Sequence, residues 1–161
     1  MRIFPVLFFV AVTSTAAFCS PGNVLENVTK IQVDPTVVGQ PDKVKDPTAA
    51  NLVRFDLRAA IRDAHFEEGA SPIRAHIVLD EFSSESKAKR LIGLSGGRTA
   101  SNTIMDGRLV IQDASGKELA SVKVHVVGSV AFSPPDQGSS TQGQATSDFE
   151  RRLLEEIDKL K

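Results

Sequence analysis

Apolar and polar residues alternate in three stretches of the chain, as they do in strands with one buried face. The stretches cover residues 73–80, 105–111 and 120–126. Between the last two lies the turn sequence Asp113-Ala114-Ser115-Gly116-Lys117, in which Gly116 accepts a positive φ without steric cost. The pattern therefore predicts a hairpin there. A short β-rich run at 28–33, followed by a loop with three prolines at 34–47, predicts an earlier strand.

Two other stretches carry apolar residues at helical spacing. The first begins at Thr48, and its stripe consists of Ala49, Val53, Leu57, Ala60, Ile61 and Ala64. The second has the stripe Phe149, Leu153, Ile157 and Leu160. The capping box Ser147-Asp148-Phe149-Glu150 predicts that this helix starts at Ser147. The residues before it, 133–147, are rich in Pro, Gly, Ser and Gln and predict a flexible loop.

The order β-α-β-β-β-α predicts an α+β fold, a two-layer sandwich of one mixed sheet with both helices on one face. Because each strand alternates, we expect the other face of the sheet to be more polar. We divide the chain into a signal peptide at 1–18, a tether at 19–27 and a single domain at 28–161.

The N-terminus has the features of an export signal. Arg2 supplies a positive charge, residues 3–12 are apolar apart from Pro5, and residues 13–17 are small. The apolar run is shorter than the roughly 20 residues that a membrane-spanning helix needs. We therefore expect an exported chain.

Cys19 is the only cysteine and directly follows the small residues, where a bacterial lipoprotein carries its lipid-modified cysteine. Ala16 and Ala17 fit the recognition sequence of the lipoprotein peptidase, whereas Phe18 stands where a small residue is required. The alternative is ordinary cleavage after Ala16 or Ala17, which leaves a soluble periplasmic protein with one free thiol. Ser20, rather than Asp, follows the cysteine, which favours the outer membrane.

Composition narrows the function classes. The 161 residues contain 19 Lys plus Arg and 20 Asp plus Glu, a net charge of −1 that argues against a nucleic-acid partner. Trp and Tyr are absent, which removes the usual stacking platforms. Nothing in the composition or the motifs predicts a cofactor.

A longer pattern resembles a known family. The segment Lys89-Arg90-Leu91-Ile92-Gly93-Leu94-Ser95-Gly96-Gly97, a strand, the Asp113–Lys117 turn, a strand and a terminal helix together resemble domain of unknown function 4410. The resemblance covers roughly residues 28–160. It implies a small bacterial envelope protein, often a lipoprotein, and it implies no catalytic residues. Leu94 and Ser95 depart from the family's usual Gly-aromatic-Gly style.

One motif suggests a hydrolase. Gly93-Leu94-Ser95-Gly96-Gly97 matches a nucleophile elbow, and Asp113 and His125 follow in the order of such enzymes. The elbow needs a strand before the serine and a helix after it, whereas the residues after Ser95 lead toward a strand. A flexible glycine turn is the simpler interpretation. A small periplasmic hydrolase using Ser95 and His125 is the alternative function.

Two further groups of residues have a functional and a plain interpretation. His76 and His125 fall on the polar sides of their strands and would share a metal with Asp80 or Asp106 only if those strands were neighbours; we expect no metal site. Arg54, Arg58 and Arg62 recur every four residues opposite the apolar stripe. They form either a contact face for anionic lipid or an acidic partner, or a solvated face relieved by Asp56, Asp63 and Glu67.

The sequence therefore predicts a non-enzymatic cell-envelope protein. We expect a binding or assembly module that faces the periplasm and is attached to the membrane by a lipid on Cys19. Its expected partner is another envelope protein.

Overall fold

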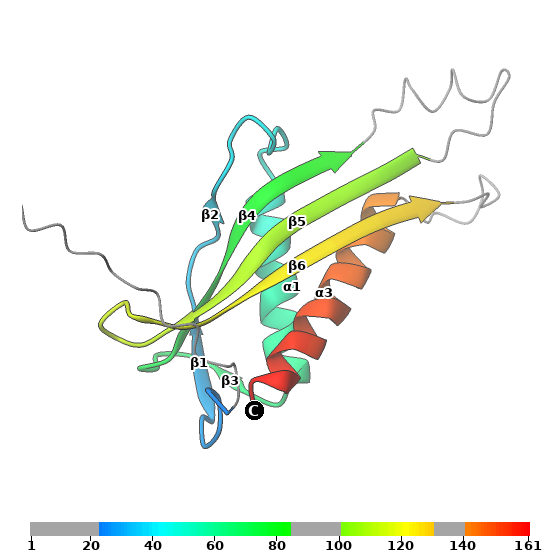
Figure 1. Ribbon diagram of the computed structural model, residues 1–161. Helices are drawn as coiled ribbons and strands as arrows, with labels where there is room; N and C mark the ends of the chain where they lie inside the picture. The colour runs from blue at the N-terminus through cyan, green and yellow to red at the C-terminus, as the bar shows by residue number, and fades with distance from the viewer. Residues whose placement is uncertain (1–22, 85–100, 131–140) are drawn as a thin grey trace, which may run out of the picture.

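The structure is a computed structural model that describes residues 23–84, 101–130 and 141–161 (Figure 1). Its elements are β1 (Lys30–Val33), β2 (Val37–Val38), α1 (Ala49–Asp63), β3 (Glu67–Glu68), β4 (Arg74–Ser84), β5 (Ser101–Gln112), β6 (Glu118–Val130) and α3 (Thr141–Lys159). The predicted α+β class is confirmed, with one mixed sheet and both helices on one of its faces. The two-residue strands β2 and β3 are additions to the predicted order.

The sheet is built around three long antiparallel strands. Its order is β3-β1-β4-β5-β6, and β2 also pairs with β4. Strands β1 and β2 run parallel to β4, whereas β4, β5 and β6 are antiparallel to one another. In this register Ile77 lies opposite Leu109, which lies opposite Val122 on the next strand. The alternation of each strand therefore places its apolar residues on one common face.

That apolar face is covered by the two helices (Figure 1). Helix α1 packs on β4 and on α3, and α3 packs on β5 and β6. The predicted stripes are the buried ones, because every one of their members is at most 3% exposed. The core therefore consists of the apolar face of the sheet and the facing stripes of α1 and α3.

Helix α1 ends in a Schellman motif. His65 adopts φ 66°, and its N–H donates to the Arg62 carbonyl. The Phe66 N–H donates to the Ile61 carbonyl, which places the buried Phe66 beside the last turn of the helix. The left-handed residue thus turns the chain toward β3.

Helix α3 starts earlier than predicted. It begins at Thr141, so Ser147 lies inside the helix and the expected capping box does not start it. Ala145, one turn before Phe149, is fully buried and extends the apolar stripe backwards. This packing offsets the weak helix propensity of the local sequence. The predicted loop at 133–147 is therefore helical from 141 on, and 133–140 lie outside the described residues.

The packed domain also begins earlier than residue 28. Leu25, placed in the tether by the sequence, is only 2% exposed, and its N–H donates to the Leu160 carbonyl at 2.7 Å. Asn23 and Asn27 on either side both adopt φ 66°, a conformation that asparagine tolerates better than most residues. The segment is thereby fixed against the end of α3.

The neighbouring strand lies so close to Gly107 that it leaves no room for a side chain. A Cβ at this position would lie 2.8 Å from the Val78 carbonyl oxygen and 3.3 Å from Ile77 Cγ2. Because the nearest atom is backbone, it has little freedom to move. We expect Gly107→Ala to lower the free energy of unfolding by roughly 1–3 kcal/mol in urea denaturation.

Gly69→Ala is the matched control. Its Cβ would meet Lys30 Cδ at 3.3 Å, part of a flexible and half-exposed side chain. We expect a change within about 0.5 kcal/mol. Equal stability of Gly107→Ala and the wild type would contradict this account of the strand pairing.

Candidate functional site

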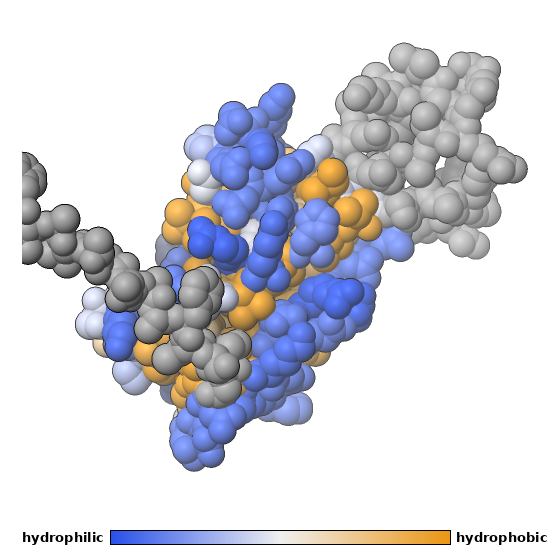
Figure 2. Space-filling view, in the orientation of Figure 1, coloured by the Kyte–Doolittle hydropathy of each residue, from blue (hydrophilic) through white to orange (hydrophobic). Residues whose placement is uncertain are grey.

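The face of the sheet opposite the helices carries four of the residues that the sequence singled out, namely His76, Asp80, Asp106 and His125. The charged and histidine side chains on this open face include Arg74, His76 and Asp80 on β4, Asp106 and Arg108 on β5, and Lys123 and His125 on β6. Figure 2 shows hydrophobic patches among hydrophilic residues on the surface. Because titratable residues from three neighbouring strands share the open face, it is the candidate functional site.

The charged residues of the open face pair with one another across strands. Arg108 Nε lies 3.8 Å from Asp80 Oδ2. Lys123 Nζ lies 3.3 Å and His125 Nδ1 3.8 Å from Asp106 Oδ2. Such cross-strand pairs contribute roughly 0.2–1 kcal/mol each. These cations are thus largely matched by neighbouring carboxylates, an arrangement suited to stabilising the face rather than to attracting a charged ligand.

The two histidines are too far separated in the sheet to act together. His76 is on β4 and His125 on β6, and β5 lies between these strands. His76 pairs with Val110, whereas His125 pairs with Asp106. Within the described ranges, three or more His, Cys, Asp and Glu side chains nowhere gather as a metal site would require. The strands that would have brought the histidines together are not neighbours.

Of the ion pairs between described residues, the most buried lies at the edge of the open face. Arg74 Nε lies 2.8 Å from Asp34 Oδ2, and the Gln32 amide donates to Asp34 Oδ1 at 3.0 Å. Burial raises the pKa of Asp34, but the contacts with Arg74 and Gln32 outweigh it and hold that pKa below its ordinary value. Sequence reasoning missed Asp34, although a lone Asp-Pro after a strand was a visible signal.

The three arginines of α1 do not form one free basic face. Arg54 Nη2 donates to the Val33 carbonyl at 3.3 Å. Arg58 Nε lies 2.8 Å from Glu68 Oε1, while Arg62 is exposed in the last turn of the helix. The prediction that Asp56 offsets the repulsion among these arginines at the surface is wrong, because Asp56 is only 5% exposed and points into the protein. Contact with an anionic partner stays a prediction.

The residues of the hydrolase hypothesis are only partly described. Ser95 lies outside the described residues. His125 is exposed on the open face beside Asp106. Asp113 is engaged in its turn, where Oδ1 accepts hydrogen bonds from Ser115 N, Ser115 Oγ and Lys117 N. The carboxylate expected to orient His125 is therefore committed to the hairpin, and the predicted positive φ of Gly116 is present at 84°.

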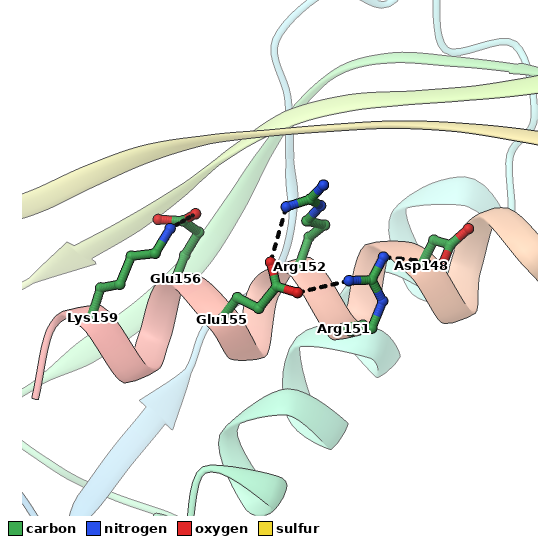
Figure 3. Close-up of polar contacts among 6 residues, drawn as sticks. All are labelled: Asp148, Arg151, Arg152, Glu155, Glu156 and Lys159. Atoms are coloured by element: carbon green, nitrogen blue, oxygen red, sulfur yellow. Dashed lines mark hydrogen bonds and ion pairs between the residues drawn. The ribbon is translucent and has the colours of Figure 1, made fainter.

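The outer face of α3 is a ladder of ion pairs (Figure 3). Arg151 bridges Asp148 and Glu155, and Arg152 also contacts Glu155. Lys159 pairs with Glu156 one turn further on. The surface over this helix is hydrophilic in Figure 2. Each of these charged side chains has a partner of opposite charge on the same helix. This face of α3 is therefore hydrophilic while its positive and negative charges balance.

Cys19 and the whole predicted signal peptide lie outside the described residues. Neither α1 nor α3 has an apolar stretch of the length needed to cross a bilayer. The nearest described part of the chain is the segment around Leu25, which packs against the end of α3. Any anchor at Cys19 would therefore join the domain at this end.

Comparisons with known proteins identify the fold. No family model and no curated protein matches the chain. A variant PelC dodecamer from Paraburkholderia phytofirmans matches with a TM-score of 0.58 and 10% identity over 88% of this chain and 92% of that chain. Another crystal form of the PelC dodecamer from this organism matches with a TM-score of 0.52 and 12% identity, over 84% and 88%.

A minor lipoprotein from Acinetobacter baumannii is also similar. It matches with a TM-score of 0.51 and 12% identity over 80% of this chain and 91% of that chain. The likeness covers nearly the whole length of each of these proteins. At such low identity it shows that the chain shares their α+β fold.

The Asp34–Arg74 pair yields a prediction. Asp34→Asn removes the charge and leaves Arg74 without its carboxylate, so we expect a loss of about 1–3 kcal/mol in the free energy of unfolding at pH 7. Because the pKa of Asp34 is lowered on folding, this contribution is present above the ordinary value of 3.8 and fades as the pH falls below it. Urea denaturation of both proteins between pH 3 and 7 measures the difference.

Asp42→Asn, a change in an exposed loop residue, serves as the control and should leave stability nearly unchanged at every pH. If Asp34→Asn were as stable as the wild type at pH 7, or if their difference grew toward low pH, the ion pair would not stabilise the fold as described.

Proposed function

We propose that this chain is a lipid-anchored protein of the bacterial cell envelope and acts there as a non-enzymatic binding or assembly module. The observation that carries the proposal is the position of Cys19, directly after the predicted export signal and a few residues before the packed domain. Its fold is shared with a protein described as a minor lipoprotein. Resemblance to domain of unknown function 4410 points to the same class.

The distance between anchor and domain supports a close attachment to the membrane. Asn23 begins the described chain, and Leu25 is already fixed to the end of α3. Three residues separate Cys19 from Asn23, so the four residue steps of an extended connection reach at most about 14 Å. A lipid at Cys19 would hold the domain with the start of β1 and the end of α3 toward the bilayer.

The proposed role is assembly or binding rather than catalysis. The charged groups of the open face are paired with one another, and the carboxylate of Asp113 is used by its turn. The PelC protein of similar fold is described as a dodecamer, which supports a role in assembly with other copies or other envelope proteins. Ser20 after the cysteine favours the periplasmic side of the outer membrane.

Replacement of Cys19 tests the anchor. Two acyl chains bury many methylene groups at about 0.8 kcal/mol each, so attachment of a diacylated chain is stable. We expect the full-length wild type, expressed in a bacterial host, to fractionate with membranes and to incorporate labelled palmitate. Cys19→Ser should lose both properties and keep its circular dichroism spectrum, because the change precedes the packed residue Leu25.

Ser20→Ala is the matched control and should keep both membrane association and the label. Phe18→Gly should speed processing in a pulse-chase experiment, because a small residue fits the peptidase site that phenylalanine fills poorly. Palmitate incorporation that persists in Cys19→Ser would contradict lipidation at this residue.

A further inference from the structure

The interface between the two helices contains a buried acid that the proposed function does not use. Asp56 lies on the buried side of α1 and is 5% exposed, among neighbours such as Val53 and Leu57 that are fully buried. Its Oδ2 has no hydrogen-bond partner among the described residues. A buried carboxylate without a partner is strongly unfavourable, whereas a neutral carboxylic acid costs much less.

Among the residues that the structure describes, none supplies a cation that compensates Asp56. Helix α3 packs on α1 and contributes the half-buried Glu150, a second acid whose charge acts on Asp56. Strand β4, which packs beneath α1, presents apolar residues such as Ile77 and Leu79 on that face. On α1 itself, Arg54 is bonded to the Val33 carbonyl and Arg58 to Glu68.

We propose that Asp56 is a proton-operated latch between α1 and α3. With its proton in place, the neutral carboxyl lets the two helices pack together over the sheet. When the proton leaves to the solvent, the buried negative charge of Asp56 is repelled by that of Glu150, and α3 loosens from α1. The latch is independent of Cys19 and of any lipid.

The protonation equilibrium sets the pH range. Burial, followed by the charge of Glu150, raises the pKa of Asp56 from 3.8 to about 7. A raised pKa means that the folded state holds the proton more tightly than the unfolded state. The stabilisation is therefore complete below about pH 4, declines as the pH rises, and is lost once the pH passes about 7.

The test compares the full-length wild type with Asp56→Asn, which keeps the size of the side chain and carries no charge. Their unfolding constants are measured in urea between pH 5 and 8, and the ratio of wild type to variant is taken at each pH. The contributions of the titratable groups that both proteins share cancel in this ratio. We expect this ratio to rise about 100-fold over this range and to level off above about pH 7.5. Glu150→Gln should move the midpoint to lower pH.

Asp63→Asn on the exposed side of α1 is the control, and its ratio to the wild type should vary little with pH. Hydrogen exchange locates the change: exchange at α3 amides, corrected for intrinsic rates, should accelerate with pH in the wild type and not in Asp56→Asn. A constant ratio, or equal acceleration at β4, β5 and α3, would overturn the latch. A carboxyl titration of wild-type Asp56 by NMR with a midpoint near 4 would overturn it without any variant.

Discussion

Burial of one face of the three long antiparallel strands under α1 and α3 is the interaction on which the rest of this structure depends. At about 25 cal/mol per Å² of apolar surface removed from water, a core that includes Ile77, Leu109 and Phe149 is the dominant stabilising term. The pairing register follows from it, since a shift by one residue would turn every apolar side chain of a strand to the solvent. Leu25 and Leu160 close the same core where the chain enters and leaves the domain.

The opposite face of the sheet carries the charged side chains of the three strands, interspersed with apolar residues such as Val110 and Val127. Its charges are arranged as cross-strand pairs, with Asp80 next to Arg108 and Asp106 next to Lys123 and His125. On the outer surface of helix α3, charged side chains are likewise compensated, here by ion pairs within the helix (Figure 3). Much of the charge on these surfaces is therefore compensated locally.

The layers of the fold were predictable because period-two and helical patterns directly report which side chains are buried. Both helical stripes and all three alternating strands lie where the sequence placed them. Strands β2 and β3 are two residues each and exist only through pairing with distant partners, which local sequence does not reveal. The early start of α3 has the same cause, because Ala145 is helical through its packing on the core.

The candidate site was less predictable. Ion pairs such as Asp34–Arg74 join residues 40 positions apart and depend on which strands become neighbours. Asp56 was misplaced for a different reason, since it lies three residues after Val53 and four before Ala60, on the buried side of the wheel. The charge of Asp56 suggested an exposed side chain, whereas its position in the helical repeat indicated a buried one. The structure has the buried arrangement, with the acid beside α3.

The mass of the mature N-terminus tests the proposed envelope attachment most directly. The full-length chain is expressed in a bacterial host, extracted with detergent and analysed by mass spectrometry of its N-terminal peptide. Attachment through the first residue predicts a mature chain that begins at Cys19 and carries the added mass of the lipid. An unmodified chain beginning at Ala17 or Phe18 would contradict it and would indicate a soluble periplasmic protein with a free thiol.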